Sequence, residues 1–176
     1  MPWRALSLVR RMIYVGLLSY WGISVRRRVI QTQVRRLLTA IAVLMVFWMA
    51  ERTVKFLFVI DVNAMRFLWY CYYLPMLLIP FLSVLVAASL GKPENYRLPR
   101  WTKLLYLPVA ALVLLVLTND LHQLVFAFPA DAVVWTDGEY SYRAGYFVAA
   151  GCMGLCALTA VGLMLFKCRG RKGRKT

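Results

Sequence analysis

Long apolar segments separated by short polar connectors recur along the whole chain and limit what it can fold into. Each segment approaches the roughly 20 residues that an α-helix needs to cross a bilayer. The chain is 62% hydrophobic, whereas soluble domains average about one half. With only 176 residues, one soluble core cannot bury that much apolar surface. We therefore predict an all-α integral membrane bundle.

The apolar segments predict about five transmembrane helices. They form one membrane domain over residues 1–166, with spans at 5–25, 37–58, 66–90, 102–126 and 144–166. Residues 167–176 are predicted to be a basic tail, too polar to fold alone. The first segment leaves two interpretations open, because its apolar part follows Arg10 and Arg11 and is short. It is a retained span whose arginines reach the interface, or it is an interfacial helix or signal peptide.

The basic residues predict the orientation. Of the 22 Lys and Arg residues, fifteen lie in the alternate segments 26–36, 91–103 and 167–176. Cytoplasmic loops carry such an excess, so we predict an outside N-terminus and a cytoplasmic C-terminus. The net charge of +15 then indicates contact with an anionic lipid bilayer, and no nucleic-acid partner is expected.

Three local features predict how the helices bend and pack. Pro75 and Pro80 lie within the third span and should kink it, because each removes a backbone donor. Glu51 and Lys55 are four residues apart, so we expect them to neutralise each other near the membrane interface. The fifth span is rich in Gly and Ala, which predicts close helix contact around Gly154.

A polar cluster interrupts the apolar stretch 112–128 and is the strongest candidate for a site. It consists of Asn119, Asp120, His122 and Gln123, and it holds the only histidine of the chain. Since no turn residue interrupts the stretch, we predict one continuous helix on which Asn119, His122, Gln123 and Phe126 share a face. Polar residues in a membrane helix are costly without partners and are functional candidates by default.

Aromatic residues begin the third span on the same predicted outer side. Trp69, Tyr72 and Tyr73 form an interfacial aromatic belt, or Tyr72 or Tyr73 turns inward and hydrogen-bonds the polar cluster. We predict a ligand-binding pocket, open to the outside, between the third and fourth spans. Its predicted residues are Asn119, Asp120, His122, Gln123, Trp69, Tyr72 and Tyr73. Histidine would allow a response to pH. The alternative is that the helix simply emerges into water and its polar residues are solvated.

No catalytic motif is present in the sequence. It contains no GxGxxG, phosphate-binding loop, HExxH or GxSxG pattern. Asp120 and His122 are two residues apart, so a helix would splay them. One His and four Cys residues give too few ligands for a plausible metal site. We therefore expect no enzyme activity, no metal and no cofactor.

Two motifs carry a resemblance to a known family. WYCYYLPM at residues 69–76 and LTNDLHQLVF at 117–126 resemble the N-terminal seven-helix membrane (7TM) sensory region of bacterial histidine kinases, which also precedes outputs such as diguanylate cyclases. The resemblance covers roughly Tyr14 to Lys167. It implies a sensor in a two-component system, a multi-pass protein of the cell membrane that detects a cue and passes it to a cytoplasmic transmitter.

The chain departs from that pattern by ending after the fifth predicted span. His122 is on the predicted outer side, so it is not expected to be a phosphoacceptor. We expect either truncation after that span or a stand-alone module, acting in trans on a histidine kinase or other signalling output, or as a homo-oligomer. The alternative function is a small membrane transporter or permease component, whose polar cluster would lie near mid-bilayer.

Overall fold

The computed structural model describes residues 2–57, 61–128 and 140–172. Their secondary structure is, in chain order, α1 (Pro2–Arg28), α2 (Thr32–Leu57), α3 (Val62–Cys71), α4 (Tyr73–Ser89), the 3-10 helix η1 (Arg100–Leu105), α5 (Tyr106–Leu117), α6 (Asn119–His122), β1 (Phe126–Ala127), β2 (Ser141–Tyr142) and α7 (Ala144–Lys172).

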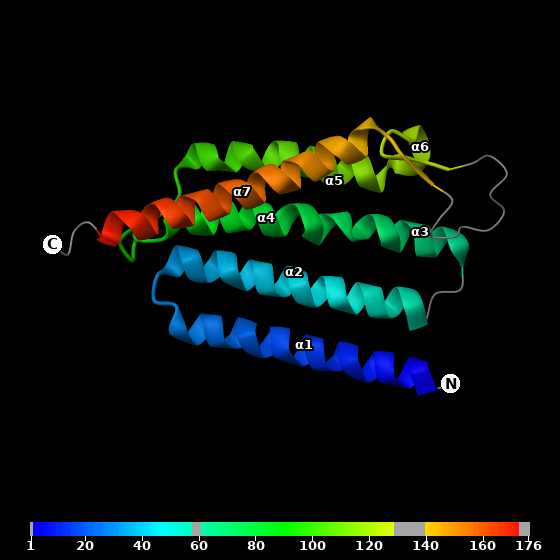
Figure 1. Ribbon diagram of the computed structural model, residues 1–176, viewed down its shortest axis with the longest axis horizontal. Coiled ribbons are helices and arrows are strands. Elements are labelled where there is room, and N and C mark those ends of the chain that lie inside the picture. The colour runs from blue at the N-terminus through cyan, green and yellow to red at the C-terminus, as the bar shows by residue number, and fades with distance from the viewer. Residues whose placement is uncertain (1, 58–60, 129–139, 173–176) are drawn as a thin grey trace.

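Helix α4 is the centre of the bundle. It packs against α2 on one side and against α7 and α5 on the other, while α1 packs against α2 (Figure 1). The buried apolar core therefore surrounds α4. Its members from five helices and the β1 region are Val34, Leu37, Ile41, Tyr70, Tyr73, Leu77, Phe81, Leu82, Leu85, Val86, Val109, Val113, Val116, Val125, Phe126 and Ala149.

Among the described residues, four helical segments are long and apolar enough to cross a membrane. They are Thr32–Lys55, Asn63–Ser89, Arg100–Leu117 and Ala144–Arg169. Their outward faces carry large apolar side chains, such as Leu158 at 74% and Phe166 at 79% exposure. Such a surface suits lipid rather than water. The predicted all-α membrane bundle is confirmed, and the described residues also include one short β ladder.

Helix α1 is not among these four segments. It is nevertheless helical over Pro2–Arg28 and lies beside α2 (Figure 1). The span at 5–25 and the total of five therefore stay predictions.

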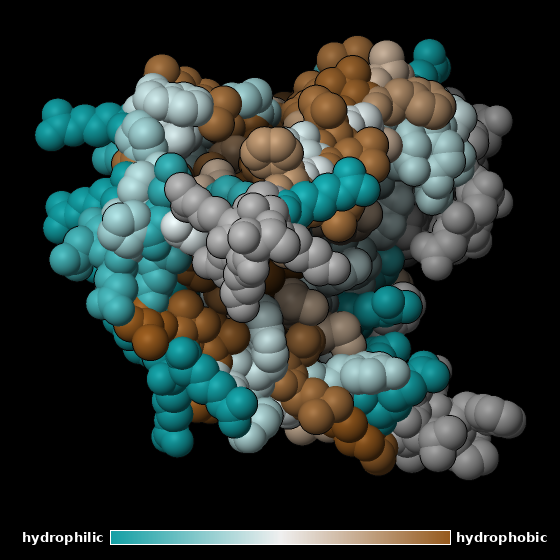
Figure 2. Space-filling model, turned by 60° about the vertical axis from the view of Figure 1, so that its left-hand side comes forward, coloured by the Kyte–Doolittle hydropathy of each residue, from teal (hydrophilic) through white to brown (hydrophobic). Residues whose placement is uncertain are grey.

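The basic segments lie together at one end of the bundle. The α1–α2 connection, the α4–α5 connection and the end of α7 share that end, whereas the start of α1 and the β1–β2 ladder lie at the other (Figure 1). Hydrophilic side chains project from the basic end when it is turned toward the viewer (Figure 2). This grouping agrees with one basic face, while its cytoplasmic orientation stays a prediction. We call the two ends the basic end and the hairpin end.

The third predicted span, 66–90, consists of two helices, α3 and α4, and begins and ends earlier in the chain than predicted. Asp61 was expected in a connector, but its Oδ2 accepts a hydrogen bond of 2.8 Å from the amide of Ala64 and so starts α3. The helix then breaks at Tyr72, whose amide bonds to the carbonyl of Trp69 at 3.3 Å. The break follows from Pro75, which cannot donate to the carbonyl of Cys71.

The prediction of one helix over 102–126 is wrong. Residues 100–105 are 3-10, α5 ends at Leu117, α6 lasts four residues, and Gln123 has a left-handed φ of 47°. Asn119, His122, Gln123 and Phe126 therefore do not share a helix face.

Helix α7 extends beyond the predicted end at 166, as far as Lys172. Its contact with α4 does not use Gly154, because a Cβ built on Gly154 would meet nothing within 4 Å. The predicted close contact there is wrong within this chain, and the buried Ala149 and Ala160 lie on α7 instead. The ammonium of Lys167 donates to the carbonyls of Ala87, Ala88 and Leu90 at 2.7, 2.8 and 2.7 Å, which ties α7 to the C-terminal end of α4.

Glu51 and Lys55 are both buried, at 6% and 3% exposure. They lie against the α3–α4 break. The Lys55 ammonium is 5.6 Å from the centre of the Tyr72 ring. Their observed neighbours therefore come from the kinked helix as well as from α2.

Candidate functional site

Asn119 is the polar centre of the hairpin end. Its side chain is fully buried, and its Oδ1 accepts bonds of 3.0 Å from the amides of Val125 and Phe126. Its Nδ2 donates to the carbonyl of Phe126 at 2.8 Å and to the Tyr70 hydroxyl at 3.3 Å. The side chain thus satisfies the backbone of a chain that reverses direction, which is why α5 does not continue as one helix.

Asp120 joins α6 to α3. Its Oδ1 accepts a 2.6 Å bond from the Tyr70 hydroxyl and lies 3.3 Å from Arg66 Nε. Tyr70 is fully buried, while the Arg66 and Asp120 side chains keep 26% and 45% exposure. Solvent weakens such an ion pair, so the shorter and only partly exposed Tyr70 bond is the stronger positioning contact. We call Asn119, Tyr70, Asp120 and Arg66 the hairpin-end network.

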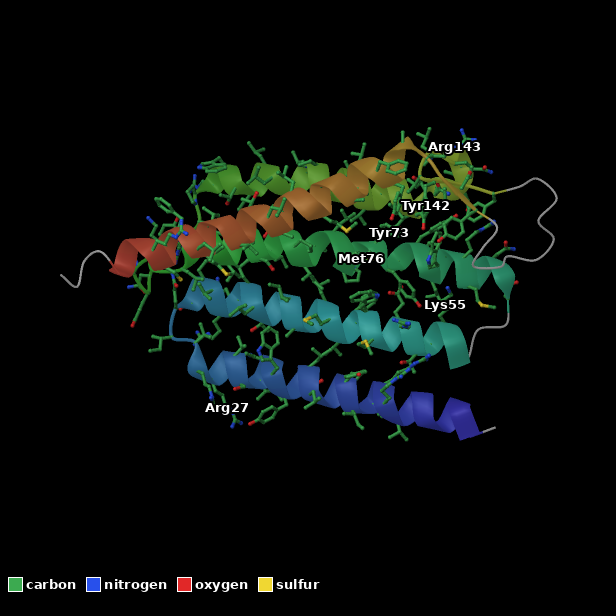
Figure 3. The ribbon with its side chains drawn as sticks, viewed as in Figure 1. Arg27, Lys55, Tyr73, Met76, Tyr142 and Arg143 are labelled. Atoms are coloured by element: carbon green, nitrogen blue, oxygen red, sulfur yellow. The ribbon has the colours of Figure 1, made fainter. Side chains whose placement is uncertain are left out.

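An aromatic cluster surrounds the fully buried Phe126. Its ring centre is 4.4 Å from that of Trp69, 5.6 Å from Tyr73 and 6.0 Å from Tyr142. Tyr140 and Tyr146 also belong to it, at 5.6 and 5.9 Å. Tyr73 and Tyr142 approach each other near the start of α4 in Figure 3. Aromatic pairs at these distances add to the hydrophobic stabilisation, so the cluster joins α3, α4, the β ladder and α7.

The β ladder is attached directly to the first turn of α7. Phe126 pairs with Tyr142 and Ala127 with Ser141. The amides of Arg143 and Gly145 then donate to the carbonyls of Val125 and Leu124 at 2.9 and 3.0 Å. A Cβ on Gly145 would lie 2.9 Å from the carbonyl oxygen of Leu124, so this close approach requires glycine.

Three predicted site residues have other neighbours. His122 Nδ1 accepts from the amide of Leu124 at 3.0 Å, and its Nε2 lies 3.2 Å from the hydroxyl of Thr118. Gln123 is exposed in the turn after α6. Tyr72 points to Lys55 on α2. Of the seven predicted residues, the structure brings together Asn119, Asp120, Trp69 and Tyr73; ligand binding by the seven stays a prediction.

Sequence reasoning missed the tyrosine that meets the polar cluster. It expected Tyr72 or Tyr73, but Tyr70 makes the hydrogen bonds. A signal was present, because Arg66, Tyr70 and Tyr73 follow spacings of four and three, which puts them on one helix face. Two of these three, Arg66 and Tyr70, contact Asp120. A charged acid is costly in a membrane protein unless it has such partners.

The cysteines suggest no further chemistry. All four are free: Cys71, Cys152 and Cys156 are half-buried, and Cys168 is exposed. No group of three or more His, Cys, Asp or Glu residues in the described part of the chain is placed to hold a metal ion.

Comparison with known proteins gives one match. A family model described as the N-terminal 7TM region of histidine kinase matches residues 8–176. No curated protein and no solved structure matches the chain. The matched region is the sensory rather than the catalytic part of a kinase, and nothing in the match supports the transporter alternative. The chain therefore belongs to the family of N-terminal 7TM regions of histidine kinases.

Proposed function

We propose that this chain detects a cue at the hairpin end and transmits it along α7 to a cytoplasmic output. The cell membrane is the proposed location, with the hairpin end outside. The proposed recipient is a histidine kinase or another signalling output, reached in trans or within a homo-oligomer.

The observation that carries this proposal is the aromatic cluster around Phe126. Because α3, α4, the β ladder and the start of α7 all contribute to it, a displacement of the ladder has to move the first turn of α7. A packed cluster passes such a displacement on as a rigid unit rather than absorbing it.

From the first turn of α7, the proposed path continues along the interface between α4 and α7, the most extensive helix–helix interface in the described residues. Helix α7 packs along α4 as far as the basic end, where Lys167 holds the last carbonyls of α4. Residues just beyond Lys167 therefore respond to any rotation or sliding of α7. The hairpin-end network is the proposed input, because the Tyr70–Asp120 bond and the Arg66–Asp120 pair are partly open to solvent and to polar ligands that could bind one arrangement of the network better than another.

The experiment measures coupling between the two ends of the full-length chain in lipid nanodiscs. A nitroxide is attached to the exposed Cys168, with a second on Arg27→Cys and the other three cysteines replaced by Ser. Asp120→Asn removes the charge that pairs with Arg66. We expect it to change the distance distribution between the labels, measured by pulsed electron paramagnetic resonance.

Leu121→Ala is the matched control, since Leu121 lies in the same α6 and is 86% exposed. It should leave the distances unchanged. If Asp120→Asn folds with wild-type helicity and also leaves them unchanged, the two ends are uncoupled and the proposed transmission is wrong.

A further inference from the structure

A second polar feature lies at the basic end, away from the hairpin-end network. A cavity of about 810 Å³ opens between the start of α2 and the α4–α5 connection. Ligand pockets in proteins range over about 300 to 1,000 Å³, so this one is large enough for a lipid headgroup or a smaller anion. Its lining includes Thr32, Gln33, Arg36, Arg97, Arg100 and Lys103.

The lining is strongly cationic. Arg36, Arg97, Arg100 and Lys103 contribute four positive charges against the single acid Glu94. Within the described ranges, none of the four cations forms a salt bridge with a carboxylate. Like charges gathered in one concavity repel each other and raise the local concentration of anions. The cavity therefore carries a net positive charge and favours an anionic ligand.

The backbone adds to this preference. Thr32 and Gln33 are the first residues of α2 and line the wall. A helix N-terminus presents free amides and the positive end of the helix dipole, which favours phosphate groups. Arginine adds planar pairs of donors that match phosphate oxygens.

The wall is held in shape by hydrogen bonds. Gln31 Nε2 donates to the carbonyl of Ser89 at 3.0 Å and reaches that of Pro93 at 3.5 Å. Thr102 is buried, and its hydroxyl donates to the carbonyl of Pro99 at 2.7 Å. The connection from α4 to η1 is thus fastened to the α1–α2 connection and to itself without any ligand.

The surroundings place the cavity where the apolar flank of the bundle begins. Trp101, Leu104 and Leu107 on η1 and α5 are exposed by 61%, 64% and 65%. An apolar flank beside a cationic cavity fits the level at which acyl chains give way to headgroups.

We propose that this cavity binds the phosphate group of an anionic ligand, either a phospholipid headgroup or free phosphate. The anion bridges Arg36 on α2 to Arg97, Arg100 and Lys103 of the α4–α5 connection. Binding there fixes the basic ends of α2 and α5 relative to each other.

The test uses the purified full-length chain in a non-ionic detergent. Phosphatidylglycerol, phosphatidylcholine or inorganic phosphate is added, and bound lipid is counted by native mass spectrometry. Arg36→Gln/Arg100→Gln should lower the apparent affinity for phosphatidylglycerol by about tenfold or more, because each arginine removes a charge-assisted contact. Arg36→Lys/Arg100→Lys should retain part of it.

The control removes the same charge outside the cavity. Arg27 and Arg28 are exposed at the same end, and Arg27 points away from the bundle in Figure 3. Arg27→Gln/Arg28→Gln should leave the affinity unchanged. An equal loss in both double variants would mean attraction by overall charge, and would overturn the site. Phosphatidylcholine binding as tightly as phosphatidylglycerol would also overturn it.

Inorganic phosphate identifies the source of the ligand. Displacement of phosphatidylglycerol by millimolar phosphate, but not by chloride of equal ionic strength, would favour free phosphate; retention of the lipid would favour the headgroup. If the double variant fails to fold, as judged by its tryptophan fluorescence, the single Arg97→Gln replaces it, since Arg97 lies in the connection outside the helices.

Discussion

Asn119→Ala should be among the most destabilising single substitutions at the hairpin end. It removes the acceptor of the Val125 and Phe126 amides and the donor to the Phe126 carbonyl. Leaving a buried polar group unsatisfied costs about 1–3 kcal/mol. Three such groups, partly relieved by water reaching the exposed side of α6, give an expected loss of about 3–5 kcal/mol in the free energy of unfolding.

Unfolding in mixed detergent micelles by titration with sodium dodecyl sulfate measures this loss. Trp69 packs 4.4 Å from Phe126, so its fluorescence contributes a report on the affected packing. Asn119→Asp is the informative comparison, because burial favours the neutral carboxyl group, which still accepts from the two amides and can donate to the Phe126 carbonyl. We expect it to cost less than Asn119→Ala.

Leu121→Ala controls for any change in α6, and should stay within about 0.5 kcal/mol because its side chain is exposed. A loss below about 1 kcal/mol for Asn119→Ala would show that the turn forms without the side chain. Equal losses for Asn119→Ala and Asn119→Asp would refute the role of the two accepted bonds.

Three further predictions concern packing and orientation. Gly22→Leu should lower the free energy of unfolding by about 1–3 kcal/mol in the same titration, because a Cβ built on Gly22 would lie 2.9 Å from the Cβ of Ala42. Gly16→Leu is the control and should be neutral, because a Cβ built on Gly16 meets no atom within 4 Å. Lys167→Met should lower the free energy of unfolding by about 1–3 kcal/mol, because it removes three hydrogen bonds to the end of α4. Arg169→Gln is the control and should leave the stability unchanged, because Arg169 is exposed. Reporter fusions after Pro99, Asp137 and Thr176 should read inside, outside and inside; an outside signal at Thr176 would reverse the orientation.

Hydropathy and charge along the sequence are sufficient for the class of the protein. Long apolar segments predict membrane helices because each helix satisfies its own backbone within the segment. The break after Cys71 agrees with the kink predicted from Pro75, since Pro75 has no amide to donate to the carbonyl of Cys71, four positions earlier. The location of the polar cluster beside the aromatic start of the third span also followed from alternating loops.

The sequence could not decide which face of each helix turns inward. In lipid both faces of a helix are apolar, so hydrophobic periodicity carries little signal. That is why Gly154 was expected in a contact that Ala149 and Ala160 occupy instead, and why Tyr70 rather than Tyr72 or Tyr73 meets Asp120.

The end of α5 is the clearest case in which tertiary contacts override the local helical preference of the sequence. Locally, residues 112–128 contain no Gly or Pro and read as one helix. The Asn119 side chain instead accepts hydrogen bonds from the amides of residues 125 and 126. Phe126 is buried against Trp69 and Tyr73. The sequence determined that this polar cluster needed partners. Only the packing of α3, the β ladder and α7 around Phe126 determined which partners it found, because those contacts join different elements of the chain and no local pattern encodes them.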